Sequence, residues 1–168
     1  MKKIAIILFL GLISCNQSDK KNFKESIDTF EPPTFQELSE IAITDGSEAL
    51  VRNPNNAVAY YGRGNGKNSL EDYEGAIIDF TAALKIHPEY FEAFYARGNS
   101  KYALKDYNGA IIDFTKAIQI DSKFSSPYLD RADSYVKLGL KDKACSDWRS
   151  VVEMGYPDFN DSIKKYSN

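Results

Sequence analysis

One sequence pattern recurs along the chain, each copy following directly on the one before. When residues 57–90 are laid over residues 91–124, 18 of the 34 positions are identical, whereas about 2 identities are expected by chance from average composition. A further shift by the same length, to residues 125–158, keeps five identities with the second copy. Repeats of this length are small units that bury their apolar faces only by stacking on their neighbours. The period therefore predicts one unit used three times, with the third copy diverged.

Each copy contains two stretches with helical spacing. Asp72 and Asp106 precede the second stretches, where a short carboxylate can accept a hydrogen bond from free helix N–H groups. Pro88 ends the first copy, because proline cannot continue a helix. We therefore expect an all-α protein. The apolar stripes of the second copy comprise Phe94, Gly98, Tyr102 and Leu104, then Ala110, Phe114, Ala117 and Ile118.

The spacing of aromatic and small residues within a copy resembles the tetratricopeptide repeat, whose period equals the length of one copy. The resemblance covers repeats at 57–90, 91–124 and 125–158, and it implies an α-α superhelix of stacked antiparallel helix pairs. In the third copy Ala132 replaces the repeated glycine and Leu140 replaces the aspartate, so its local geometry is expected to differ. The residues that carry the resemblance in the first copy are Tyr60, Gly64, Tyr73, Ala76, Phe80, Ala83 and Pro88.

The register extends beyond the three repeats at both ends. Residues 34–56 predict an N-terminal half-repeat, a lone second helix over 35–53, in which Gly46 is the weakest position because glycine costs about 1 kcal/mol relative to alanine. After Gly155 and Pro157, apolar residues at spacings of four and three predict a C-terminal capping helix over 159–168, which terminal repeats need. These apolar residues are Phe159, Ile163 and Tyr166.

The N-terminus predicts a targeting segment and an anchor. Two lysines followed by about ten apolar residues fit a secretory signal peptide over 1–14, too short to span a bilayer as a helix. The sequence Leu12-Ile13-Ser14-Cys15 resembles the lipobox of bacterial lipoproteins, which implies lipidation of Cys15 and an anchor in the membrane. Residues 15–33 would then form a flexible tether, the alternative being a short helix packed on the repeats. Asn16 after the cysteine implies, by the same resemblance, the outer membrane facing the periplasm.

Composition argues against several other functions. With 21 basic and 24 acidic residues, the net charge of −3 leaves no basic field for nucleic acid. One histidine and two cysteines are too few for a zinc cluster, so we expect no metal and no other cofactor. No nucleophile–base motif or phosphate-binding loop is present, so we expect no enzyme. Cys145 is expected to be a buried thiol and His87 a surface residue.

Arginine and aspartate recur at fixed positions of the repeat. Each arginine stands between an aspartate of the preceding copy and an aspartate of its own copy, at constant spacings, which predicts structural ion pairs between stacked helices. A catalytic acid and base is the alternative, but a motif present in every repeat favours a scaffold role. The residues are Asp45, Arg63, Asp79, Arg97, Asp113, Arg131 and Asp147.

The family resemblance also implies a partner-binding groove lined by the first helices of the repeats. Asparagines there resemble those that hold an extended peptide, whereas tyrosines that only fill space between helices are the alternative. Co-chaperone members of this family clamp a C-terminal carboxylate. Their clamp needs lysine at the positions of Tyr61 and Leu129 and a cation at the position of Asp133, so it is not expected here. The groove residues are Tyr61, Asn65, Asn68, Tyr95, Asn99, Tyr102, Leu129, Asp133 and Val136.

We therefore expect a protein-interaction module: a membrane-tethered scaffold or adaptor for a complex of the bacterial cell envelope that binds a protein or peptide. The alternative is a carbohydrate-binding accessory lipoprotein, because aromatic grooves also stack sugars.

Overall fold

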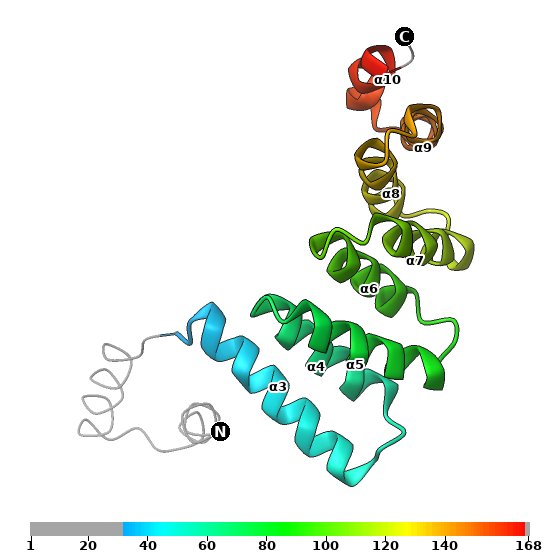
Figure 1. The fold of residues 1–168 in the computed structure, drawn as a ribbon. Helices are drawn as coiled ribbons and strands as arrows, with labels where there is room; N and C mark the ends of the chain where they lie inside the picture. Colours follow the sequence, from blue (N-terminus) through cyan, green and yellow to red (C-terminus); the bar gives the residue numbers. More distant parts are fainter. Residues whose placement is uncertain (1–31, 167–168) are drawn as a thin grey trace, which may run out of the picture. The chain divides into compact units, whose positions relative to one another are not determined.

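The computed structural model describes residues 32–166, and all regular structure in this part is helical (Figure 1). This confirms the expected all-α class. The predictions for the signal peptide at 1–14, for Cys15 and for most of the tether lie outside the described residues. The helices are α3 (Phe35–Arg52), α4 (Ala57–Ser69), α5 (Tyr73–Ile86), α6 (Phe91–Ala103), α7 (Tyr107–Ile120), α8 (Ser126–Lys137), α9 (Lys141–Glu153), the 3-10 turn η1 (Pro157–Phe159) and α10 (Asn160–Tyr166).

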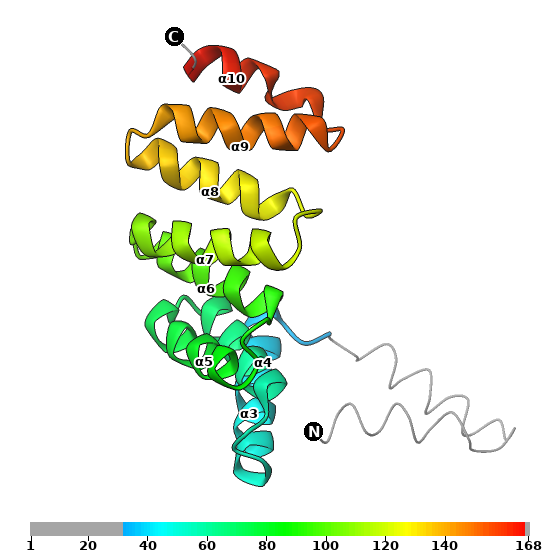
Figure 2. The same ribbon diagram turned by 90° about the vertical axis from the view of Figure 1, so that its right-hand side faces the viewer.

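Each helix from α3 to α9 packs against the helix that follows it, as the order in Figure 2 shows. The hairpins α4–α5, α6–α7 and α8–α9 fall within the three copies of the repeat. The first helices of neighbouring copies, α4 with α6 and α6 with α8, also meet. Helix α3 lies against α4 where the half-repeat was expected, and η1 and α10 lie against α9 where the cap was expected.

The turn inside each hairpin is set by the residue that begins its second helix. Asp72 and Asp106 cap α5 and α7 by accepting hydrogen bonds of 2.9 Å from the N–H groups of Gly75 and Gly109. Helix α9 begins after Leu140, whose side chain makes no capping hydrogen bond. The loss of the aspartate in the third copy therefore leaves its second helix without a side-chain cap.

The core of each hairpin depends on a close approach between its two helices. Phe80 and Phe114 are fully buried, and a Cβ atom added to Gly64 or Gly98 would lie 2.7 or 2.6 Å from the Cε1 atom of the facing ring. Such contacts are far inside van der Waals distance. Glycine is therefore required by the ring, and the third copy, with Ala132, carries Trp148 in place of phenylalanine.

Helix α3 approaches α4 closely through two glycines. A Cβ atom on Gly46 would lie 2.8 Å from the Cβ of Arg63, and one on Gly66 would lie 2.8 Å from the backbone oxygen of Ser39. The glycine that weakens the helix prediction is thus the residue that lets α3 pack here. Tertiary packing outweighs the propensity cost of about 1 kcal/mol.

The last hairpin is covered by the C-terminal segment. Ala144, Cys145 and Trp148 form a buried cluster that η1 and α10 contact. The thiol of Cys145 lies 3.9 Å from the backbone oxygen of Ile163, so the cysteine packs as a small apolar side chain with a weak hydrogen bond. Over residues 32–166, no helix is both long and apolar enough to cross a membrane.

Candidate functional site

The repeated arginines and aspartates pair within each hairpin. The guanidinium of Arg97 on α6 donates two hydrogen bonds, of 2.9 and 2.7 Å, to the carboxylate of Asp113 on α7. Arg63 with Asp79 and Arg131 with Asp147 repeat the same fork. The aspartates are buried and the contacts bidentate, so the pairs hold the two helices of a hairpin in register.

Asp45 departs from this pattern. It stands at the repeat position of the paired aspartates, but it is exposed and forms no ion pair with any residue in 32–166. The physical reason is that α3 lacks a preceding first helix of its own hairpin. The arginine of the next copy, Arg63, turns to Asp79 instead. The spacing from an aspartate to the arginine of the following copy therefore does not mark an ion pair.

Further groups join the arginine–aspartate pairs. Arg97 also donates to the hydroxyl of Thr81 in the preceding repeat at 2.9 Å, and Arg131 donates to Thr115 at 2.8 Å. A lysine one turn after the arginine, Lys101, binds the carboxylate of the same repeat at 2.7 Å. The second network thus ties its hairpin together and joins it to the one before.

The sequence also indicates these lysines, because they recur at one position of the repeat. Lys67 and Lys101 occupy the same position of the first and second copies, four residues after the arginines, and each binds the aspartate of its repeat. In the third copy the lysine position is Tyr135, and the carboxylate of Asp147 there is bound by Arg131. The third network is therefore the one with a single cation among the described residues.

The neighbouring cations lower the pKa of Asp79. Burial by itself raises the pKa of this carboxyl group, but hydrogen bonds from Arg63 and Lys67 outweigh burial and bring the pKa below its ordinary value. The carboxylate therefore stays charged at neutral pH and is compensated on both oxygens. A paired carboxylate of this kind serves structure rather than proton transfer.

The groove residues expected on α4 are only partly exposed. The ring of Tyr61 lies 5.9 Å from that of Phe80 and 5.1 Å from that of Tyr90. The side-chain oxygen of Asn68 accepts a hydrogen bond of 2.7 Å from the hydroxyl of Ser100 on α6. Two of the three residues, Tyr61 and Asn68, thus take part in packing between helices, and Asn65 is half-buried on the same helix.

The groove residues expected on α6 face α8. The hydroxyl of Tyr95 donates a hydrogen bond of 2.6 Å to the carboxylate of Asp130 on α8, and it lies within hydrogen-bonding reach of Asn99. Further along the helix, Tyr102 interacts with the carboxylate of Asp133. Tyr95, Asn99 and Tyr102 therefore lie together along one side of α6.

The groove residues expected on α8 differ in their exposure. Leu129 and Val136 pack against the buried cluster under η1 and α10, whereas Asp133 is exposed and faces Tyr102. This cluster comprises Ala132 of α8 itself and Ala144, Cys145 and Trp148 of α9. Leu129 and Val136 thus belong to the core of the last hairpin, while Asp133 stays accessible.

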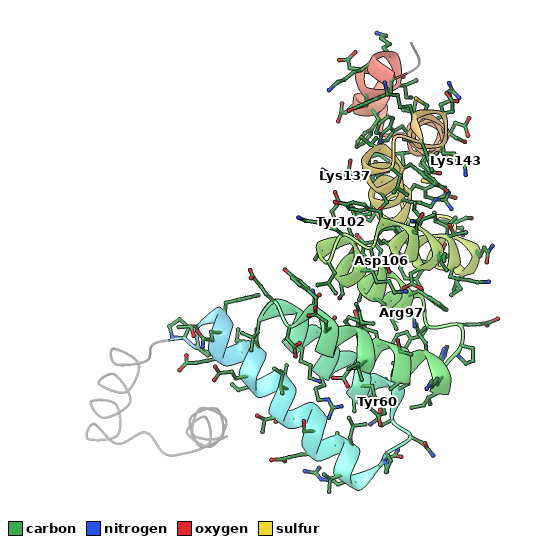
Figure 3. The ribbon with its side chains drawn as sticks, viewed as in Figure 1. Tyr60, Arg97, Tyr102, Asp106, Lys137 and Lys143 are labelled. Carbon is green, nitrogen blue, oxygen red and sulfur yellow. The ribbon has the colours of Figure 1, made fainter. Side chains whose placement is uncertain are left out.

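We call the surface where these two helices meet the α6–α8 face. The hydrogen bond from the hydroxyl of Tyr95 to the carboxylate of Asp130 joins the two helices there. Figure 3 shows Tyr102 on α6 and Lys137 on α8 toward the same edge of the stack. The face consists of Tyr95, Asn99 and Tyr102 on α6 with Ser126, Asp130 and Asp133 on α8.

Sequence reasoning missed Asp130, although a signal existed. The matching residues of the first and second copies are Gly62 and Ala96, so a carboxylate appears here only in the third copy. A departure from small residues at a repeated position points to a local role, and this aspartate holds the hydroxyl of Tyr95.

The environment shifts the pKa of both partners upward. For Tyr95, burial and the hydrogen bond to Asp130 raise the pKa to about 12. For Asp130, burial raises the pKa most and the negative charge of Asp133 adds to it, while the hydrogen bond from Tyr95 acts in the opposite direction. Asp130 is thus held in a partly desolvated place, one helical turn from the exposed carboxylate of Asp133.

The side chains in 32–166 bring no three His, Cys, Asp or Glu residues together in a way that could hold a metal ion. What the α6–α8 face can offer is hydrogen-bond acceptors, two carboxylates and tyrosine rings, which suit recognition of a partner.

Comparisons with known proteins agree with this architecture. Residues 91–124 match the family model for the tetratricopeptide repeat (TPR). The comparison with curated protein sequences finds no match.

Three solved structures illustrate the likeness of fold. MamA has a TM-score of 0.66 and 21% identity, over 85% of this chain and 96% of that one. YrrB, a TPR protein, has a TM-score of 0.64 and 26% identity, over 69% of this chain and 60% of YrrB. The first TPR of Spaghetti (RPAP3) has a TM-score of 0.61 and 20% identity, over 66% of this chain and 90% of that one. The described helices therefore have the fold of tetratricopeptide-repeat proteins, and residues 91–124 form one repeat of that family.

Proposed function

We propose that this chain is a non-enzymatic interaction module, a membrane-tethered adaptor that binds a protein or peptide partner along the α6–α8 face. The observation that carries the proposal is this face itself, in which Tyr95 and Tyr102 on α6 meet the two carboxylates of α8 across a helix–helix contact and Asn99 lies beside Tyr95. The packed helices hold these groups in place before binding, which lowers the entropy cost of association.

Similar proteins support binding of peptides. YrrB is described as having an unusual peptide-binding site, and the first TPR of Spaghetti (RPAP3) was solved with a bound HSP90 peptide. Neither the family match nor these structures favour carbohydrate binding. The likeness supports the kind of function, and the side chains of this chain decide the partner.

The α6–α8 face also differs from a surface whose tyrosines only fill space. Tyr102 is half-buried, Asp133 is exposed, and both can contact a partner without leaving their helices. Tyr95 and Asp130 stiffen the contact between α6 and α8 beside them. Rigid aromatic side chains beside polar groups are typical of interface residues that contribute most to binding.

The tether is the second part of the proposal. The lipobox-like sequence before Cys15 supports lipidation, and two acyl chains give stable anchoring because each buried CH₂ contributes about 0.8 kcal/mol. We place the protein in the bacterial cell envelope, on the outer membrane facing the periplasm. Metabolic labelling with an alkyne fatty acid tests the anchor: wild type takes up the label and sediments with membranes, and Cys15→Ala does neither. Equal labelling of both proteins contradicts lipidation at this residue.

Site-specific photo-crosslinking in the envelope tests partner binding. A benzoylphenylalanine placed at Tyr102 is expected to capture a defined protein, and the same probe at Tyr156, an exposed tyrosine of the turn before η1, serves as the matched control. Asn99→Ala is expected to lower the yield at least several-fold, and Asn108→Ala on α7 is expected to leave it unchanged.

Two results contradict the proposal. The first is capture of the same protein with equal yield from both probe positions, which indicates nonspecific proximity. The second is an unchanged yield in Asn99→Ala when circular dichroism shows that the variant is folded, because the amide at the centre of the face then contributes nothing.

A further inference from the structure

The two helices of the α6–α8 face each present one stripe to the other. On α6, Phe91 and Tyr95 precede Asn99 and Tyr102 at spacings of four, four and three residues, which places them on one side of the helix. On α8, the stripe runs over Ser126, Asp130, Asp133 and Lys137, at spacings of four, three and four. The hydrogen bond from Tyr95 to Asp130 joins the two stripes at the middle.

The carboxylates on this face have no cation of their own. Neither Asp130 nor Asp133 forms an ion pair with any residue between 32 and 166. Lys101 on α6 is bound to Asp113 at 2.7 Å, and Lys137 lies one helical turn beyond Asp133 without pairing to it. The face therefore carries two adjacent negative charges, unlike the aspartates of the repeat networks.

Asp130 sits in an unfavourable place without a cation. Burial and the neighbouring Asp133 both act on Asp130 to raise its pKa, which means that its charged form is disfavoured there. A cation between the two groups would relieve the repulsion and replace lost solvation.

Aromatic rings border the carboxylates. The ring of Tyr102 lies 5.3 Å from that of Tyr107 in an edge-on arrangement. At the other end, the rings of Phe91 and Phe124 lie 5.0 Å apart, and Phe124 is 53% exposed. Rings of this kind accept the apolar stem of lysine or arginine, and their faces attract the cationic head.

We infer that the α6–α8 face selects a peptide segment with a lysine or arginine, whose cationic head lies against Asp130 and Asp133 and whose stem lies on the neighbouring rings. The inference rests on the proposed function, and it adds the chemistry of the partner. The positions of these side chains indicate where the partner residue binds, and the negative charge of the face indicates that this residue is a cation. A partner that presents a carboxylate here would meet like charge and is rejected.

Selection from a phage-displayed random peptide library tests the inference. The full chain is expected to enrich peptides with lysine or arginine next to an aromatic or aliphatic residue. Asp133→Asn, which changes an exposed side chain, is expected to lose this enrichment, and Asp142→Asn, an exposed aspartate on α9, is expected to keep it.

Calorimetry on an enriched peptide then gives the size of the effect. Replacing the basic residue with norleucine, or Asp133 with asparagine, is expected to weaken Kd by about tenfold, because each removes one partner of a charge pair. Raising the salt concentration is expected to weaken Kd as well. The same peptide with glutamate in place of its basic residue serves as the acidic probe and is expected not to bind.

The outcomes separate the two proposals. Enriched peptides that are neutral or acidic and that still lose binding in Asn99→Ala overturn the basic-residue inference and leave the function proposal standing. Enrichment of no peptide overturns the inference, and crosslinking at Tyr102 then decides the function by itself. Basic peptides whose Kd is unchanged in both Asp133→Asn and Asp130→Asn place the cation elsewhere and overturn the inference too.

Discussion

Asp113 is the buried anchor of the second repeat's ion-pair network, and its neutralisation tests how the hairpins are held together. The side chain is fully buried, with both carboxylate oxygens bound by Arg97 at 2.9 and 2.7 Å and one of them by Lys101 at 2.7 Å. Asp113→Asn keeps the shape of the side chain and removes its charge. Two cations are then left facing a neutral amide.

The expected cost is about 3–5 kcal/mol, the range for breaking a buried charge pair. The lower end applies, because the side chains of Arg97 and Lys101 remain 16% and 20% exposed and can regain some hydration. Asp147→Asn removes the partner of one cation rather than two, so its cost is expected to be smaller.

Urea unfolding followed by circular dichroism measures these changes, with Glu89→Gln, an exposed residue of the turn after α5, as the control. The control is expected to stay within about 0.5 kcal/mol of wild type. A loss below about 1 kcal/mol for Asp113→Asn, or equal losses for the two aspartates, would refute the reasoning that the number of bound cations sets the cost.

Three other predictions follow from the geometry. Gly98→Ala is expected to lower the free energy of unfolding by about 1–3 kcal/mol, since its new Cβ would meet the buried ring of Phe114 at 2.6 Å; an unchanged urea midpoint contradicts the clash. Lys105 and Gly139 have φ of 64° and 73°, a backbone conformation that favours glycine. Lys105→Gly is therefore expected to stabilise the protein by about 0.5–1 kcal/mol, and Gly139→Ala to destabilise it by about 1 kcal/mol. Thermal unfolding measures both changes, and effects of the same sign contradict this account of the two turns. The pKa of Tyr95, raised to about 12 from 10.0, gives stability that is present below pH 10.0 and lost as pH rises toward about 12. Urea titrations across this alkaline range on wild type and Tyr95→Phe measure it, and parallel curves would count against the shift.

Most of the fold could be predicted from periodicity because the same local sequence pattern occurs in each copy of the repeat. The pairs of helical stretches recur in every copy, and the aspartates that begin α5 and α7 and the glycine opposite phenylalanine recur in the first two. Gly46 was the position where local propensity argued against the helix, and close packing on Arg63 explains why glycine stands there. Packing between helices is information that single-helix propensity does not contain.

The candidate site was harder to predict because its residues break the repeat. Spacing placed Leu129 and Val136 with Asp133, but both apolar residues pack against the buried cluster of the last hairpin, and spacing alone does not show which positions neighbouring helices cover. Asp130 stands alone at its repeat position and so gave no periodic signal. Each arginine had two possible aspartate partners by spacing, one in the preceding copy and one in its own, and only the structure separated them.

Hydrogen–deuterium exchange on the chain with and without its captured partner is the most direct test of where binding occurs. Added protection is expected in peptides from 91–103 and 126–137, which cover α6 and α8, with little change in α5 and α7. Protection confined to α5 and α7, with α6 and α8 unchanged, would contradict partner binding at the α6–α8 face.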